Sequence, residues 1–143
     1  LLVKNVESLL EMTKNVKVSF MSTINNLALP SLIDFTKWVA SLKEKFGVKR
    51  VRIDFAKLKH PDFLDVHNAS TKLKSFLIMT NAFVQSNDWF IDREKERISR
   101  IVNSVKHTQT KHEITERFLK FINEYDRRRG YHFEKIFNKE DFL

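Results

Sequence analysis

The sequence predicts an α/β fold in which an αβαβ segment is followed by a helical C-terminal extension. Apolar residues recur at helical spacing along most of the chain and alternate with the period of a strand in two short stretches. The two glycines both follow a predicted helix. The 143 residues, 42% of them hydrophobic, suffice for a cored fold. We expect two parts, residues 1–60 with the strands and residues 61–143 with the later helices.

The first half of the chain alternates helix and strand. Helical spacing predicts a helix over residues 2–14, and alternation over residues 16–20 predicts a strand. A second helix is predicted from Ser31 as N-cap to Gly47 as C-terminal stop, followed by a strand over residues 51–55. Such a βαβ unit has parallel strands. Two strands are too few for a stable sheet, and the sequence does not begin with Met, so we expect a segment of a longer protein.

The second half is predicted to be helical. A turn and an irregular loop occupy residues 60–68, and helices follow over about residues 70–86 and 88–106. The last helix is predicted to be capped by Thr110 and to end at Gly130. The aromatic residues after it imply a tail that packs back on the body.

One face of the predicted sheet is polar. If the apolar residues of both strands pack under helices, then Ser19, Met21 and Thr23 point to the opposite side, as do Arg52 and Asp54. A parallel sheet covered on both faces is apolar on both, so a polar face is typical of a barrel lined for a ligand. The alternative is that Arg52 and Asp54 face water or pair with a neighbouring strand.

Ligands of parallel sheets bind at the C-terminal ends of the strands. The residues at these ends are Thr23, Asn25, Asn26, Asp54, Ala56 and Lys57. Asparagine pairs also form turns. We expect Asn25 to face a pocket and Asn26 to shape the loop.

Charge gives two further indications. The formal net charge of +8 fits either a solvated lysine-rich surface or a nucleic-acid-binding surface. The densest cluster, Arg127 to Arg129, either complements the C-terminal end of its helix or binds a phosphate or carboxylate. The five histidines lack metal-site spacing, so solvated or capping roles are favoured and no metal ligand is expected.

Two stretches resemble a known family. The sequence VSFMSTINNLALPSLIDFTKWVASL followed by VRIDFAKLKHP resembles the fifth and sixth βα elements of radical S-adenosylmethionine (radical SAM) enzymes. The sequence YDRRRGYHFEKIF resembles the closing motif of members with a small twitch-type extension, common in phages and environmental bacteria. The resemblance covers most of the chain. It departs from the family at Asn138, where a proline is expected.

The resemblance implies a fold and a chemistry. The chain would be the C-terminal part of a partial (β/α)6 TIM-type barrel. In this family the N-terminal half carries three cysteines that hold a [4Fe–4S] cluster, which cleaves S-adenosylmethionine to a 5′-deoxyadenosyl radical. This sequence contains no cysteine, so the cluster would belong to a preceding part of the same protein.

The resemblance also implies roles for individual residues. Thr23, Asn25 and Asn26 would approach the nucleoside or the substrate, while the sixth strand would contact the adenine largely through its backbone. The residues of that strand are Asp54, Phe55 and Ala56. Candidate substrate- or anion-binding residues are Ser19, Arg52, Arg127, Arg128 and Arg129. No catalytic acid or base is implied.

The expected function is therefore to complete the barrel and line the pocket for S-adenosylmethionine and an unknown substrate, without activity in this segment alone. The expected partner is the N-terminal half of the same protein, located in the cytoplasm and not in a membrane. One alternative is a small basic module whose Arg127 to Arg129, Lys72 and Lys74 contact nucleic-acid phosphates. Another is a helical protein-interaction domain.

Overall fold

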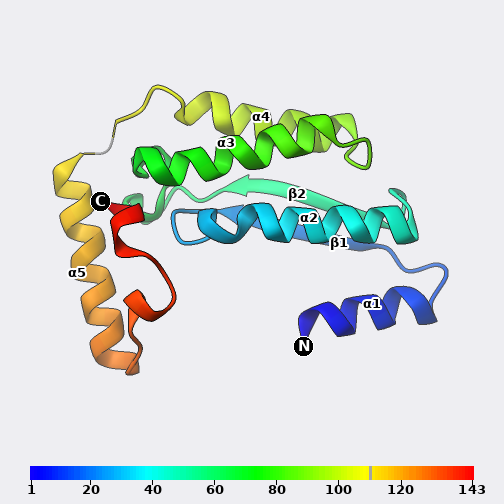
Figure 1. Cartoon of the computed structure of the whole chain (residues 1–143), viewed down its shortest axis with the longest axis horizontal. Helices are drawn as coiled ribbons and strands as arrows, with labels where there is room; N and C mark the ends of the chain where they lie inside the picture. Colours follow the sequence, from blue (N-terminus) through cyan, green and yellow to red (C-terminus); the bar gives the residue numbers. More distant parts are fainter. Residues whose placement is uncertain (110) are drawn as a thin grey trace.

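The computed structural model describes residues 1–109 and 111–143, and consists mostly of helices around a small parallel sheet (Figure 1). The helices and strands are α1 (Leu2–Met12), β1 (Val18–Ile24), α2 (Leu29–Phe46), β2 (Val51–Lys57), α3 (Thr71–Ser86), α4 (Asp92–Val105) and α5 (His112–Arg129). Short 3₁₀ turns are η1 (Asp62–Leu64), η2 (Val66–Asn68), η3 (Phe133–Lys135) and η4 (Lys139–Phe142). The α/β class, the helical second half and the parallel pairing of the strands are confirmed. Thr110, the predicted cap of the last helix, lies outside the described residues.

Two helix starts differ from the prediction. Helix α2 begins at Leu29 instead of after Ser31, because Pro30 suits the first turn of a helix, where no backbone donor is needed. Helix α4 begins at Asp92, later than expected, because the Glu94 side chain accepts the amide of Ile91 at 3.0 Å and fixes the start there.

Both glycines end helices, as predicted. Gly47 has φ 92° and donates its N–H to the carbonyl of Lys43 at 2.8 Å. Gly130 adopts the left-handed conformation with φ 66° and donates to the carbonyl of Asp126 at 2.9 Å. At both positions a side chain would strain the backbone.

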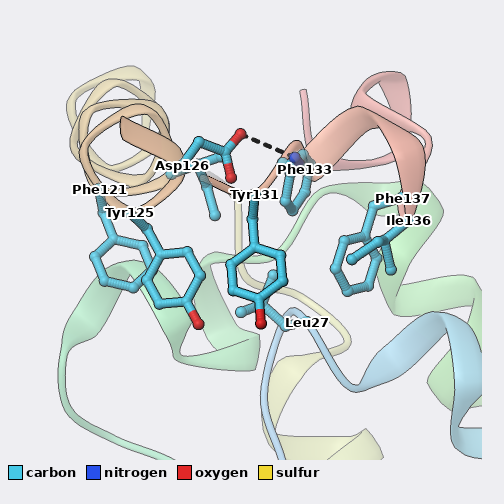
Figure 2. Close-up of a pocket in the computed structure, with 9 residues that line it drawn as sticks. Leu27, Phe121, Tyr125, Asp126, Tyr131, Phe133, Ile136 and Phe137 are labelled. Carbon is cyan, nitrogen blue, oxygen red and sulfur yellow. Dashed lines mark hydrogen bonds between the residues drawn. The ribbon is translucent and has the colours of Figure 1, made fainter. Parts of the chain in front are cut away.

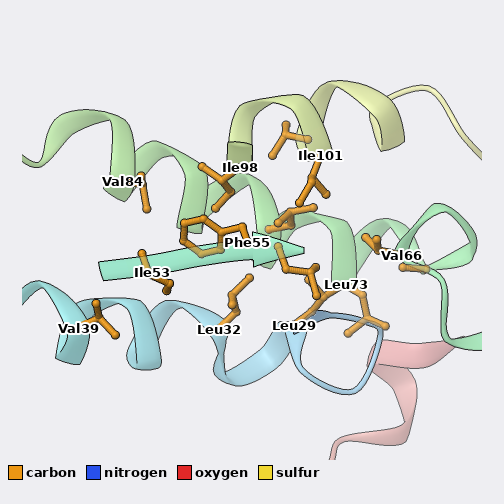
Figure 3. Packing of buried hydrophobic residues seen from close by; sticks show 14 of the residues in the cluster. Leu29, Leu32, Val39, Ile53, Phe55, Val66, Leu73, Val84, Ile98 and Ile101 are labelled. Carbon is orange, nitrogen blue, oxygen red and sulfur yellow. The ribbon is translucent and has the colours of Figure 1, made fainter. Parts of the chain in front are cut away.

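The core lies between α2 and the α3–α4 pair. Strands β1 and β2 pair in register from Val18 opposite Val51 to Ile24 opposite Lys57. Helix α2 connects them and packs on α3, while α4 packs on α3 and β2. Figure 3 shows Ile53 and Phe55 of β2 between α2 and the two later helices, beside buried residues from all of these elements.

The tail after α5 packs back on the body, as predicted, and runs beside α5 in Figure 1. Phe142 stacks on Phe118 of α5 with ring centroids 5.3 Å apart, and Phe133 contacts both rings edge-on. The hydroxyl of Ser70, before α3, donates to the backbone carbonyl of Asp141. The tail thus joins α5 to α3.

The two edges of the sheet differ. The outer edge of β2 is covered by α4, whose Glu94 Oε1 accepts the amide of Ile53 at 3.0 Å. Strand β1 has β2 as its one neighbour among the described residues. Because Val18 donates to the carbonyl of Arg50 at 2.8 Å, the alternating backbone turns the amides of Ser19, Met21 and Thr23 away from β2. The sheet therefore ends in an open edge at β1.

Candidate functional site

The predicted polar face of the sheet is present. Ser19 and Met21 of β1 and Arg52 of β2 are exposed, whereas Phe20 and Ile53 face the helices. Within the described part of the chain this face is covered by no further strand. In this segment Arg52 is therefore exposed to water, which was the alternative to a face lined for a ligand.

The predicted site residues on this face fall into two groups at opposite ends of the strands. Ser19 pairs with Arg52 near the N-terminal ends, and Thr23 pairs with Ala56 near the C-terminal ends. Four residue steps along the strand, of about 3.3 Å each, separate the groups by about 13 Å. They therefore cannot contact the same small group.

At the N-terminal ends, the sheet and α4 enclose a polar cavity of about 150 Å³, which we name the arginine pocket. Its lining residues are Ser19, Arg52, Ile53, Asp54, Ile91, Arg93, Glu94 and Arg97. Arg97 of α4 is ion-paired with Asp54 at 2.5 Å. Asp54 was expected to face water or to pair with a neighbouring strand, and it pairs with a helix instead. Arg93 and Arg97 were missed by sequence reasoning. Their four-residue spacing, which places both on one face of α4, is the signal that could have found them.

Behind this pocket lies a buried ion pair that sequence reasoning also missed. The ammonium of Lys43, fully buried in α2, donates to both carboxylate oxygens of Glu94 at 2.8 and 2.9 Å. Glu94 also accepts the amides of Ile53 and Ile91. Burial lowers the pKa of Lys43, the hydrogen bond and charge of Glu94 oppose this, and the charge of Arg52 lowers it slightly further. Glu94 therefore joins α2, β2 and α4.

At the C-terminal end of β1 both asparagines use their side chains to hold the loop. The Asn25 side chain forms the turn, since its Oδ1 accepts the amides of Leu27 at 3.0 Å and Ala28 at 3.2 Å. Asn26 is buried and donates to the carbonyl of Phe63 at 3.0 Å. The prediction that Asn25 faces a pocket is wrong, because its side chain closes the turn. Asn26 helps to hold the loop, as expected, through its bond to Phe63.

Asn26 nevertheless has an unusual environment. Its Oδ1 is buried and has no hydrogen-bond partner among the described residues. It borders a cavity of about 10 Å³, which is about the size that holds one water molecule. This oxygen therefore suits a water inside the protein better than a large ligand.

The residues predicted to contact a cofactor thus differ in availability. Phe55 places its side chain in the core, and Asp54 is paired with Arg97. Thr23 is exposed and Ala56 half-buried on the polar face. At the C-terminal ends of the strands, Thr23 and the end of β2 therefore remain available to contact a ligand.

A polar cluster follows β2 at the same end. Asp65 Oδ1 lies 2.8 Å from Nδ1 of His67 and accepts the backbone amide of His67 at 3.0 Å. The Lys57 ammonium lies 3.1 Å from Nδ1 of His67. Lys57 was predicted to lie at this end. The Asp65–His67 pair was missed, although an Asp two residues before a His in a loop after a strand could have suggested it.

The arginine cluster on α5 is largely engaged on its own helix. Glu124 binds Arg127 with both oxygens, at 2.7 and 2.9 Å, and also binds Arg128 at 2.5 Å. These hydrogen bonds, first from Arg127 and then from Arg128, lower the pKa of Glu124 to about 2. The Arg129 guanidinium lies over the ring of Tyr125. Complementing the helix end accounts for much of this cluster.

The lysines of the nucleic-acid alternative are also engaged. Lys72 pairs with Asp141 at 2.5 Å, and the mostly buried Lys74 donates to the carbonyl of Thr108 at 2.8 Å. Burial lowers the pKa of Lys74. A side chain held in this way is poorly placed to contact a phosphate backbone.

A further cavity lies between α5 and the tail and is shown in Figure 2. It measures about 370 Å³ and is mostly apolar. Tyr125 and Tyr131, which line it, stack with ring centroids 6.1 Å apart, and Asp126 accepts the amide of Phe133 at 2.8 Å. The groove continues to Leu27, in the loop after β1.

No group of three or more potential metal ligands gathers within residues 1–109 and 111–143. No helix in these ranges has the length and apolar character needed to cross a membrane. Comparisons with protein-family models, curated proteins and solved structures gave no match.

Proposed function

We propose that this chain is the C-terminal portion of a radical SAM enzyme, in which β1 and β2 are the last two strands of a partial barrel supplied mainly by a preceding part of the same protein. The observation that carries the proposal is the difference between the two sheet edges. Glu94 accepts a backbone amide at the outer edge of β2, whereas the outward amides of β1 have no partner within residues 1–109 and 111–143. Further strands can therefore join at β1, and β2 suits the position of a terminal strand.

Exposed apolar side chains support the same arrangement. Met21 is 78% exposed in the middle of the polar face. Helix α1, which precedes β1, exposes Leu2, Leu9 and Met12 as well. Apolar surface of this kind on neighbouring elements marks a contact with another part of a protein. A preceding barrel segment would cover it.

Few of the chain's own residues are free to contact the cofactor. Thr23 offers an exposed hydroxyl, and the half-buried Ala56 of β2 lies beside it on the same face. Asn25 and Asn26 use their side chains within the loop and support it from behind. The sequence has no cysteine, so an iron–sulfur cluster would be held by the preceding part. When bound, the cluster would supply the electron that cleaves S-adenosylmethionine, and this chain would position the nucleoside.

The helical extension would enclose one side of the proposed cofactor site. Helix α4 covers the edge of β2, and the loop carrying Asp65 and His67 lies at the C-terminal end of that strand. A cytoplasmic location stays a prediction.

The experiment begins with the complete reading frame that encodes this chain. A Cys-x3-Cys-x2-Cys sequence upstream of Leu1 supports the proposal, and an initiator Met directly before Leu1 contradicts it. The complete protein, reconstituted anaerobically with iron, sulfide and a reductant, is expected to convert S-adenosylmethionine to 5′-deoxyadenosine. Thr23→Val is expected to weaken binding of S-adenosylmethionine about tenfold, the size of one lost hydrogen bond to a charged ligand. Thr36→Val, which removes a hydroxyl buried in α2, is the control. Absence of cofactor binding by the complete protein would refute the proposal.

A further inference from the structure

We propose that the arginine pocket binds a phosphate group, either as free phosphate or as the phosphoryl end of a larger ligand. The proposal does not depend on the proposed function, because the pocket lies at the N-terminal ends of the strands, away from Thr23 and Ala56.

The two carboxylates of the arginine pocket are paired, whereas two of its three arginines are not paired within the described part of the chain. Of its two carboxylates, Glu94 is taken up by Lys43 and two backbone amides, and Asp54 is paired with Arg97. Arg52 and Arg93 have no hydrogen-bond or ion-pair partner among the described residues. Two exposed arginines thus line one cavity without an ion-pair partner of their own in the described ranges.

The geometry suits a small, doubly charged ligand. Arg52 extends from the sheet and Arg93 from α4, so the two cations approach the cavity from different elements. Guanidinium groups bind phosphate oxygens with two parallel hydrogen bonds. Ser19 adds a hydroxyl from β1.

The size of the cavity limits the ligand. At about 150 Å³ it is smaller than the usual pockets of drug-sized ligands, which begin at about 300 Å³. It can accept a terminal group such as phosphate. A larger ligand would leave its remainder on the open polar face of the sheet.

The test is a titration of the 143-residue chain with inorganic phosphate, followed by amide chemical shifts of the pocket residues. Arg52→Gln and Arg93→Gln are each expected to weaken binding at least tenfold. Asp54→Asn is expected to tighten it several-fold, because it removes a repelling carboxylate and frees Arg97. Arg100→Gln is the matched control, since it removes the same charge from α4 outside the pocket. It should leave affinity within twofold of the original.

The outcomes separate specific binding from general attraction to a basic surface. If Arg52→Gln and Arg93→Gln bind phosphate as well as Arg100→Gln does, the proposal is refuted. Equal affinity for acetate and phosphate would also overturn it. A sugar phosphate or nucleoside monophosphate that binds more tightly than inorganic phosphate would identify a phosphoryl ester as the ligand, and equal or weaker binding would identify free phosphate. Amide spectra of each variant verify that it is folded.

Discussion

Replacing Glu94 with Gln is expected to destabilise the protein strongly, because the carboxylate neutralises a fully buried ammonium. Glu94 accepts four hydrogen bonds, two from Lys43 and one each from the amides of Ile53 and Ile91. Removing one charge of a buried pair costs about 3–5 kcal/mol, since the other charge stays buried. The free energy of unfolding of a chain of this length is roughly 7–21 kcal/mol. The substitution should therefore lower the melting temperature by about 6–20 °C.

The measurement is urea unfolding at pH 7, followed by circular dichroism. Glu96→Gln is the matched control, since Glu96 lies two residues further along α4 in an exposed pair with Arg100. Its expected cost is below about 1 kcal/mol. If the free energies of unfolding of the two variants differ by less than about 1 kcal/mol, Glu94 does not join α2, β2 and α4 as described.

The pH dependence of the Glu94→Gln variant provides a second check. Burial already lowers the pKa of Lys43 below 10.5, and loss of the Glu94 carboxylate removes the main opposing effect. Folded Lys43 then binds its proton less tightly than the unfolded chain does. Stability of the variant should therefore rise with pH, from the lowered pKa up to the ordinary value of 10.5. If the stability of the variant stays lower than that of the original protein by the same amount from pH 7 to pH 10, this explanation is contradicted.

Three further predictions concern α5 and the loop after β1. Arg127→Gln should raise the pKa of Glu124 from about 2 toward 4.5 in a carbon-detected NMR titration, and an unchanged pKa would contradict this. In the original protein, the contribution of this pairing to stability should be lost as pH falls from 4.5 to 2. Gly130→Ala should cost about 1–2 kcal/mol of unfolding free energy, because φ is 66°, and a neutral effect in urea unfolding would show that the helix end relaxes. Asn25→Ala should cost about 1–2 kcal/mol through two lost turn hydrogen bonds, whereas loss of cofactor binding at unchanged stability would restore the pocket-facing role.

Local patterns predicted the elements well because each pattern has a direct physical cause. Alternation identified both strands and the polar face, and Gly47 and Gly130 ended helices as their backbone angles require. Helix starts were less accurate. The start of α4 depends on Glu94, whose capping role is also fixed by contacts with β2 and α2.

The candidate sites were harder to predict because they combine distant parts of the chain. Ser19 and Arg52 were identified from the strands, but Arg93 reaches their pocket from a helix about 40 residues further along, as expected when non-local packing decides. The roles of Asn25 and Asn26 could not be distinguished from sequence. The choice depends on Phe63, whose carbonyl accepts the Asn26 amide from the loop after β2.

The central claim, that a preceding segment adds a strand to β1, is tested most directly by native-state hydrogen exchange. The amides to follow are those of Ser19, Met21 and Thr23, which point away from β2. In the 143-residue chain they should exchange rapidly, whereas in the complete protein they should be protected at least a hundredfold. The amides of Phe20 and Ser22 face β2 and should be protected in both. Equal exchange of the three outward amides in the two proteins would contradict the account.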